Sequence, residues 1–391
     1  MTPAARLQAA IEILDEVINS ARNDGPPADA IVTRFFKQRR YAGSKDRRAV
    51  RELVFRALRR SADRPDSGRA ALLGLVADEP ELLDLFGEPR GPEPKAEDER
   101  AAEPGFVPQW LIPELSPLVG EREWPALLER APLDLRVNTG RTSRDELLSE
   151  LSNAVPTPLS PWGVRLAQDS RVDDQAVYLD GLVEVQDEGS QLIALACDAK
   201  AGERIIDLCA GAGGKSLALS AAAPHAHVLA TDSNRARLSK LPERAERAGA
   251  EIEVRLLNPP RELDELSDCR DRADLVLVDA PCSGSGTWRR NPDGRWRLTP
   301  GRLDRLVGAQ ERLLDIAAEL VRPGGRLVYA VCSLLSREGA GQIERFLQRH
   351  SSWISEPSPI PGGRSDGAGL LLTPGHDHTD GFFVARLGRP C

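Results

Sequence analysis

The chain has 391 residues, of which 41% are hydrophobic, and this is enough to build the cores of two to three domains. Its formal net charge of −8 argues against a protein that coats nucleic acid without regard to sequence. Six cysteines without a Cys-x-x-Cys pair argue against a disulfide framework and against a zinc ribbon. No run of about 18 apolar residues and no signal-peptide pattern occurs, so a cytoplasmic protein without a membrane segment is expected.

Residues 1–86 predict a small all-helical domain. Its apolar residues recur at spacings of three and four, as in Leu7, Ile11, Leu14 and Ile18. Between residues 34 and 60, eleven Lys or Arg stand against two acids, so the acidic average conceals a basic patch. Residues 87–105 are rich in proline, glycine and charge and predict a linker.

Residues 106–180 predict a compact subdomain that mixes helix and strand. Residues 110–128 are expected to form a helix and residues 134–138 a short strand. A second helix follows, for which Ser143 and Glu146 have the spacing of a capping box.

From residue 181 to residue 391, apolar strands alternate with amphipathic helices, which predicts a doubly wound parallel sheet. The expected strands are residues 204–208, 228–231, 252–257, 275–278 and 326–331. Two further apolar runs, at 369–373 and 381–387, predict a hairpin added to this sheet. The predicted fold class is therefore α/β, preceded by a small α+β subdomain and a helical N-terminal domain.

A glycine-rich loop, Cys209-Ala-Gly-Ala-Gly-Gly-Lys215, follows the first of these strands and opens a helix, so that backbone can approach a ligand closely. A Walker phosphate loop needs a glycine where Cys209 stands, and a dinucleotide fingerprint needs one where Ser216 stands. The pattern of S-adenosylmethionine sites remains. Asp207 and Asp232 end two strands, and the second acid is placed to bind ribose hydroxyls.

Two cysteines follow two other strands, Cys282 in Asp279-Ala-Pro-Cys-Ser-Gly284 and Cys332 in Tyr329-Ala-Val-Cys-Ser333. A thiolate can add to an electron-poor ring carbon, whereas a structural cysteine only fills space. One such cysteine would favour packing, but two at corresponding strand ends behind a glycine loop favour catalysis. Cys209, inside the loop, is expected to pack rather than to act as a third catalytic thiol.

These motifs resemble those of the RsmB/Sun family of bacterial RNA cytosine-5 methyltransferases. The resemblance is carried by the glycine loop, both cysteine corners, Arg136-Val-Asn138, Gln186-Asp-Glu-Gly-Ser190 and Asp380-Gly-Phe-Phe383. It covers residues 106–391 well and residues 1–86 more weakly, where the helices look like the family's RNA-binding NusB-like domain. It implies a Rossmann-like catalytic sheet, S-adenosylmethionine as cofactor and RNA as partner, with ribosomal RNA ahead of transfer RNA. No metal is expected, and the chain is expected to be a monomer.

The resemblance also implies a role for each matching residue. Cys332 matches the nucleophile that adds to carbon 6 of cytosine, and Cys282 matches the cysteine that assists loss of the carbon-5 proton and product release. Asp279 is expected to bind the cytosine amino edge near the methyl donor, and Lys215 to reach this aspartate or the cofactor. The cofactor itself is expected at Cys209, Ala210, Gly211, Ala212, Gly213, Gly214, Lys215, Asp232, Asn258 and Asp279.

The chain departs from the family pattern at two places. The family loop usually has Ala-Pro where this chain has Gly211-Ala212, which keeps the close-approach glycines. An acid often contacts the adenine after the third strand, where this chain has Asn258. An amide can donate and accept on the adenine edge, so contact there stays a hypothesis.

Several alternatives remain open. Residues 288–297 place two tryptophans among four arginines, which favours contact with unpaired RNA bases, although an arginine-lined structural loop would have the same composition. The His-x-His pairs at 225–227 and 376–378 are not expected to bind metal. Rival functions are transfer RNA cytosine-5 methylation, DNA cytosine-5 methylation, and a non-catalytic RNA-binding assembly factor that retains a degenerate methyltransferase fold.

Overall fold

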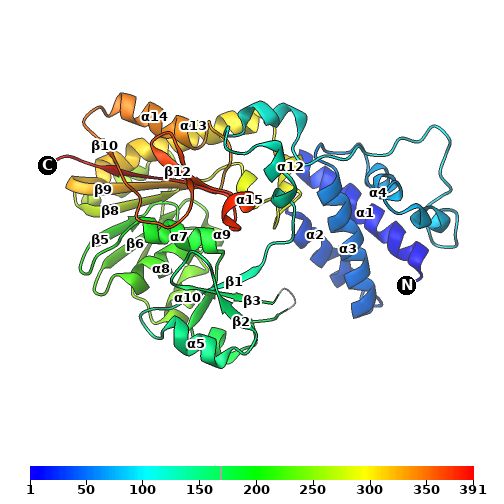
Figure 1. The fold of residues 1–391 in the computed structure, drawn as a ribbon, viewed down its shortest axis with the longest axis horizontal. Coiled ribbons are helices and arrows are strands. Elements are labelled where there is room, and N and C mark those ends of the chain that lie inside the picture. Colours follow the sequence, from blue (N-terminus) through cyan, green and yellow to red (C-terminus); the bar gives the residue numbers. More distant parts are fainter. Residues whose placement is uncertain (168–169) are drawn as a thin grey trace. The chain divides into compact units, whose positions relative to one another are not determined.

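The computed structural model describes residues 1–167 and 170–391 (Figure 1). The chain divides into two compact units. The first consists of residues 1–115, 120–130 and 287–300, and the second of residues 116–119, 131–286 and 301–391. The first unit therefore includes the segments predicted as helical domain and linker, and the second includes both sheets. Within the described ranges, no helix combines the length and the hydropathy that crossing a bilayer requires.

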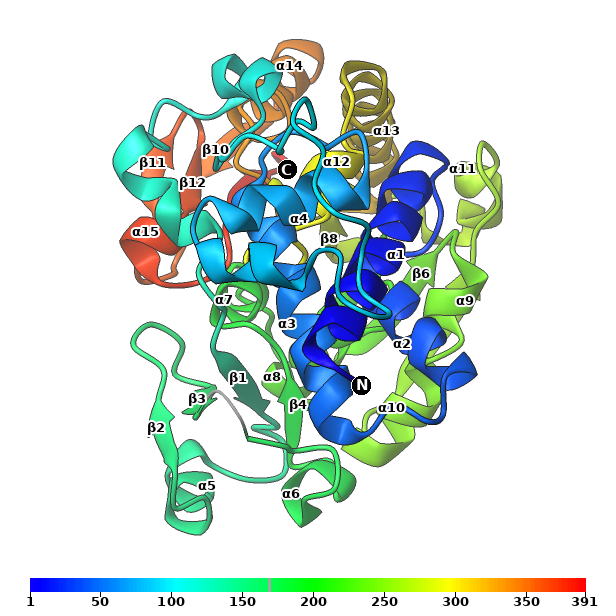
Figure 2. The ribbon, with the colours of Figure 1, turned by 90° about the vertical axis from the view of Figure 1, so that its right-hand side faces the viewer.

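Four helices build the core of the first unit. They are α1 (Pro3–Arg22), α2 (Ala28–Gln38), α3 (Ser44–Arg60) and α4 (Gly68–Val76), followed by the 3-10 helix η1 (Pro80–Leu85). Helix α1 lies beside α3 and α4, and their apolar stripes enclose one core (Figure 2). The closest approach is at Gly68, where a Cβ atom would lie 2.3 Å from the Ile11 carbonyl oxygen. Only glycine allows the two helices to meet there.

Residues 110–128 form three short 3-10 helices instead of the expected single helix. These are η2 (Gln109–Glu114), η3 (Glu121–Glu123) and η4 (Pro125–Leu127). Pro113 and Pro125 explain the difference, because proline has no N–H to donate and its ring clashes with the preceding helical turn. The two prolines therefore prevent a continuous helix.

The tryptophan- and arginine-rich segment belongs to the core of the first unit. It follows η6 (Ser285–Thr287) and contains the helix α12 (Gly294–Arg297). Trp288 and Trp296 are only 1% exposed, and the indole N–H of Trp296 donates to the Ser61 carbonyl at 2.9 Å. Arg295 is also buried and donates to five backbone carbonyls, those of Leu58, Arg59, Gly105, Phe106 and Pro292. The expectation of RNA contact is wrong for these three side chains, and the structural alternative is correct.

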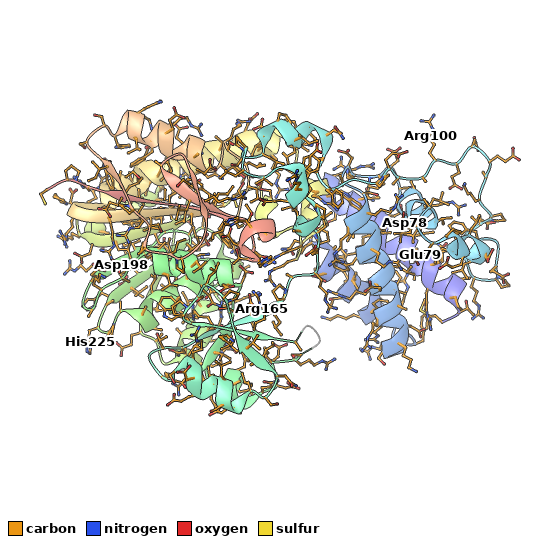
Figure 3. All side chains as sticks on the ribbon, viewed as in Figure 1. Asp78, Glu79, Arg100, Arg165, Asp198 and His225 are labelled. Atoms are coloured by element: carbon orange, nitrogen blue, oxygen red, sulfur yellow. The ribbon has the colours of Figure 1, made fainter. Side chains whose placement is uncertain are left out.

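A small antiparallel sheet opens the second unit. Its strands, in the order β2-β3-β1-β4, are β1 (Leu133–Val137), β2 (Ala154–Pro156), β3 (Gly163–Leu166) and β4 (Val183–Val185), with the helices α5 (Arg144–Glu150) and α6 (Ala176–Leu179). The predicted capping box is confirmed, since Glu146 N–H donates to Ser143 Oγ and the Glu146 carboxylate accepts from Ser143 N–H. Arg165, labelled in Figure 3, pairs with the buried Asp134 at 2.7 Å across β3 and β1.

The larger sheet has nine strands, and their order is β11-β12-β13-β9-β8-β5-β6-β7, with β10 paired to β13. The strands are β5 (Arg204–Asp207), β6 (His227–Asp232), β7 (Ile252–Leu256), β8 (Ala273–Asp279), β9 (Val321–Val331), β10 (Ile354–Glu356), β11 (Arg364–Asp366), β12 (Gly369–Leu372) and β13 (Phe382–Gly388). Strands β5 to β9 pair in parallel and β12 and β13 join them as an antiparallel hairpin, which confirms the predicted fold class.

Helices cover both faces of this sheet. They are α7 (Glu188–Ala196), α8 (Gly214–Ala222), α9 (Arg235–Leu238), α10 (Leu241–Ala248), α11 (Glu262–Glu265), α13 (Pro300–Leu320), α14 (Ala340–Arg349) and α15 (Pro374–Asp377), with the 3-10 helix η5 (Ser267–Cys269). In Figure 1, α7 and α8 lie on one face and α13 and α14 on the other. The chain order reverses at β5, whose neighbours are β6 and β8. Ligands of such sheets bind beyond the carboxyl ends of the strands at this switch point.

Candidate active site

The glycine-rich loop joins β5 to α8 at the switch point. Gly211 and Gly213 have φ values of 58° and 83°, in the left-handed region that favours glycine. A Cβ atom on Gly213 would lie 2.1 Å from Leu241, and one on Gly211 would lie 2.5 Å from the Arg237 guanidinium. No side chain caps the N-terminus of α8, so its first N–H groups are available to polar groups of a ligand.

Asp232 ties the loop to the end of β6. Its carboxylate accepts the N–H of Gly211 at 2.7 Å and the N–H of Asn234 at 2.6 Å. A carboxylate has about four acceptor positions, so two such bonds leave room for ligand hydroxyl groups. The backbone N–H of Ala210 donates to Thr231 O at 2.8 Å, which holds the other end of the loop against β6.

Asp207 is the other acid of the predicted cofactor pattern, but it is fully buried. One carboxylate oxygen lies 2.6 Å from Ser216 Oγ, and the other has no hydrogen-bond partner. Burial raises the pKa of Asp207 from 3.8 to about 7, and the negative charge of Asp279 adds to the effect. Asp207 therefore orients the start of α8 from the interior, and only Asp232 lies at the edge.

We expect the replacement Asp207→Asn to change how stability depends on pH. In the unfolded chain this carboxyl ionises near 3.8 and in the folded chain near 7, so the free energy of unfolding falls as pH rises between these values. Asparagine has no proton to lose. The free energy of unfolding of the variant, relative to that of the wild type, should therefore rise by on the order of 2 kcal/mol between about pH 5.5 and about pH 8. Urea unfolding at each pH measures this difference. A difference independent of pH would mean that Asp207 does not carry this proton.

Lys215 and Asp279 form an ion pair between the start of α8 and the end of β8. Lys215 Nζ lies 2.7 Å from Asp279 Oδ2 and 5.4 Å from the ring centre of Phe382. Burial lowers the pKa of Lys215, but the carboxylate of Asp279 outweighs it, and Cys332 acts in the same direction, so the net shift is upward. Lys215 is thus a fixed cation near Cys332, and the side chain of Asp279 is still 29% exposed.

The two cysteine corners meet at the ends of β8 and β9. Cys282 Sγ lies 3.4 Å from Cys332 Sγ, and both residues are partly exposed. The parallel register explains the meeting, because Asp279 lies opposite Ala330 and the two cysteines follow a few residues later. The pKa of Cys282 is raised well above its ordinary value, first by its hydrogen bond with Cys332 and then by burial. Cys282 therefore keeps its proton at neutral pH.

A carboxylate that the sequence reasoning missed lies behind both corners. Glu338 accepts hydrogen bonds from Ser283 N–H at 2.9 Å, from Ser333 Oγ at 2.6 Å and from the Gln310 amide at 2.9 Å. Ser283 and Ser333 each follow one of the two cysteines. The repeated Cys-Ser pair was the only sequence signal that could have pointed to this network.

Asn258 follows Leu257, whose backbone N–H donates to the Asp232 carbonyl at 3.0 Å. Its own N–H and its side-chain amide both donate to the Glu265 carboxylate, each at 2.8 Å. The side-chain N–H that donates to Glu265 is therefore engaged outside the glycine loop. Adenine contact by Asn258 stays a prediction.

The remaining family motifs support the loop from behind. Arg136 Nη1 donates to the Gly214 carbonyl at 2.6 Å and to Gln186 at 2.8 Å, and burial lowers the pKa of Arg136 to about 10. Asp380 N–H donates to the Asp187 carboxylate at 3.1 Å, which ties the start of β13 to the start of α7. The Ala212 carbonyl accepts from Arg244 at 2.5 Å. These contacts position backbone and place no new group at the edge.

Cys209 lies in the glycine loop at this edge, whereas His225 lies away from it. Burial raises the pKa of the Cys209 thiol well above its ordinary value, so it remains protonated. His225, labelled in Figure 3, lies in the turn before β6, at the opposite end of that strand from Asp232. Within the described part of the chain, no three side chains of His, Cys, Asp and Glu gather in a way that could hold a metal ion.

Two family models match the chain. The model described as 16S rRNA methyltransferase RsmB/F matches residues 194–388, and that described as the RsmF/B-like ferredoxin-like domain matches residues 107–173. Curated relatives include the probable ribosomal RNA small subunit methyltransferase B of Synechocystis sp., 35% identical over 303 residues, and ribosomal RNA small subunit methyltransferase B of Enterobacter sp., 34% identical over 288 residues. Each match covers 72% of this chain and 66% of the relative, so the chain spans slightly less than two thirds of their length.

Solved structures agree with the fold. The crystal structure of PH0851 has a TM-score of 0.75 at 24% identity and covers 99% of each chain. A methyltransferase homolog protein from Pyrococcus horikoshii has a TM-score of 0.59 at 26% identity, covering 68% of this chain and 90% of its own. NSun6 from the same organism, solved with SFG, has a TM-score of 0.59 at 19% identity, covering 68% of this chain and 93% of its own.

Proposed function

Because this chain belongs to the RsmB/F family of 16S rRNA methyltransferases, we propose that it methylates carbon 5 of a cytosine in ribosomal RNA. The observation that carries the proposal is the pair of partly exposed thiols, Cys282 and Cys332, 3.4 Å apart at adjacent strand ends. A cation and a carboxylate, Lys215 and Asp279, lie at the same edge. An activated cysteine can add covalently to an electron-poor pyrimidine ring, and a second thiol beside it can take part in proton transfer.

S-adenosylmethionine is the family's cofactor, and the residues at the switch point fit it. Gly211 and Gly213 allow the tight turn at this point, because Arg237 and Leu241 occupy the space that a side chain at either position would need. Asp232 would accept ribose hydroxyls, and the N–H groups that begin α8 would bind the polar end of the ligand. When bound, the cofactor supplies an electrophilic methyl group.

The proposed first step uses Cys332 as the nucleophile. Its thiolate donates an electron pair to carbon 6 of cytosine, and the electrons of the ring double bond move so that carbon 5 becomes nucleophilic. The thiolate is the attacking form of cysteine, whereas free cysteine is mostly thiol at neutral pH. After carbon 5 is methylated, loss of its proton returns the electrons, and the bond from sulfur to carbon 6 breaks.

Three other side chains have proposed roles around this step. Asp279 would accept the cytosine amino N–H through its exposed carboxylate oxygen, while Lys215 holds the other oxygen. Cys282 shares a hydrogen bond with the sulfur of Cys332 and would assist removal of the carbon-5 proton and product release. This role suits a thiol that keeps its proton at neutral pH, because it can act in proton transfer without competing as a nucleophile.

RNA as substrate is supported by the basic patch of the first unit. Five exposed cations on α2, α3 and the loop between them have no acidic partner among the described residues: Lys37, Arg40, Lys45, Arg47 and Arg48. Tyr41 lies among them and is 75% exposed. Cations that bind phosphate and an aromatic ring that stacks on a base are the usual means of holding unpaired RNA. The chemistry also requires the target base to leave its stack, and this costs the least free energy for an unpaired cytosine.

The test is methylation of defined RNAs by the purified full chain with labelled S-adenosylmethionine. We expect label in small-subunit ribosomal RNA and, by bisulfite sequencing, a single protected cytosine that is unprotected in RNA from cells without the protein. Label only in transfer RNA would contradict the ribosomal substrate, and label only in DNA would contradict RNA as substrate. RNA binding without any heat of cofactor binding by calorimetry would favour the non-catalytic assembly factor.

A further inference from the structure

Glu338 is a buried carboxylate without a cation. It is 0% exposed, and among the described residues no Lys, Arg or His forms an ion pair with it. Burying an unpaired charge is costly unless hydrogen bonds to its oxygens compensate. The neighbouring residue Arg337 instead pairs with Asp304, so the buried charge has not been neutralised by the nearest cation along the chain.

All four donors to this carboxylate come from the machinery around the two thiols. From the corner after β8 it accepts the N–H and the hydroxyl of Ser283, and from the corner after β9 it accepts the hydroxyl of Ser333. From α13 it accepts the amide of Gln310, which also donates to the Pro281 carbonyl at 2.9 Å. The Glu338 side chain thus links α13 to both cysteine corners. In each corner it binds the serine that directly follows the cysteine.

The structure assigns Glu338 as the positioning residue of the two thiols: its carboxylate clamps Ser283 and Ser333 and so sets the separation of Cys282 and Cys332. The inference rests on the proposed function of these cysteines. Because both corners are loops, nothing in the strand pairing alone fixes their sulfurs, and a shift of about 1 Å in a reacting group can cost about 10²-fold in rate. The charge of Glu338 also contributes to the raised pKa of Cys282, after the hydrogen bond with Cys332 and burial.

The direct measurement is cross-linking of the two thiols by diamide. Two thiols lose two electrons and two protons to the azo group of diamide, which becomes a hydrazine, and a bond of about 2 Å forms between the sulfurs. We expect this reaction, followed by peptide mass spectrometry of the 282–332 link, to be at least about fivefold slower in Glu338→Gln than in the wild type. Glu344→Gln is the matched control, an exposed glutamate on α14.

Steady-state methylation separates positioning from general loss of structure. With rates divided by the number of cofactor-binding sites, Glu338→Gln should lower kcat about 10- to 100-fold while the Kd for S-adenosylmethionine changes less than about twofold. Glutamine has the shape of glutamate, but its NH₂ group is itself a donor and cannot accept the hydrogen bonds that one carboxylate oxygen of Glu338 accepts. If this variant does not fold, Ser333→Ala removes a single donor, and we expect cross-linking about threefold slower.

The outcomes distinguish this inference from the proposed function. If the cross-linking rate and kcat of Glu338→Gln both stay within about twofold of the wild type, the role of Glu338 is overturned. It is also overturned if the activity falls only in proportion to the number of cofactor-binding sites. If the wild type transfers no methyl group yet Glu338→Gln still slows the cross-link, the proposed function fails and the positioning of the two thiols stands. If Ser333→Ala leaves the cross-linking rate unchanged, the clamp is overturned as well.

Discussion

Methyl transfer to RNA should fall by about 10³-fold or more when Cys332 is replaced by alanine. The reason is chemical, because carbon 5 of cytosine is a poor nucleophile until sulfur has added to carbon 6. Cofactor affinity should remain within about twofold of the wild type, since Cys332 follows β9 and forms no hydrogen bond with Asp232 or the loop glycines among the described residues. The measurement is transfer of labelled methyl to ribosomal RNA beside calorimetry with the cofactor.

The matched control is Cys391→Ala, which removes an exposed thiol at the C-terminus. It should methylate at the wild-type rate. Activity that survives Cys332→Ala would remove covalent catalysis by this residue from the mechanism. Loss of activity in both variants would instead mean that removing any thiol lowers activity, so the effect would not be specific to Cys332.

A covalent complex of protein and RNA should accumulate when Cys282 is replaced by alanine. In the proposed mechanism Cys282 assists loss of the carbon-5 proton, and without that loss the bond between Cys332 and carbon 6 cannot break. The variant should therefore form a band retarded in a denaturing gel, sensitive to ribonuclease, in the presence of RNA and S-adenosylmethionine. The wild type should show at most a faint band at the same position.

The double replacement Cys282→Ala with Cys332→Ala is the control, and it should form no adduct. A band in the double variant would mean that another nucleophile is attached to the RNA. An active wild type beside a Cys282→Ala variant without any adduct would contradict the role assigned to Cys282, even if Cys332 remained essential.

Much of the catalytic unit was predictable because its signals are local. The strands β5 to β9 were found from short apolar runs, since strands buried on both faces of a sheet have to be apolar along their length. The glycine loop was found because positive φ values at Gly211 and Gly213 require glycine. The meeting of Cys282 and Cys332 followed from strand ends that share one edge, although the 3.4 Å distance did not.

The errors arose where composition does not determine burial. Trp288, Arg295 and Trp296 have the composition of an RNA-binding loop, yet they are buried in the core of the first unit. The guanidinium of Arg295 can be buried because backbone carbonyls converge on it, and four of these five carbonyls belong to residues 189 or more positions earlier. Asp207 ends β5 as predicted, but its position at the strand end did not reveal that its carboxylate turns toward Ser216.

The sequence by itself determined strands β5 to β9, the glycine loop and the two thiols, because periodicity, backbone conformation and nucleophile chemistry are properties of a few neighbouring residues. Only the tertiary structure decided which groups surround those thiols. Glu338 is 55 residues from Ser283 along the chain, and it reaches this serine because β8 and β9 pair in parallel and end together. A carboxylate's partners depend on which loops the sheet brings to one edge, and that information is not present in any single segment.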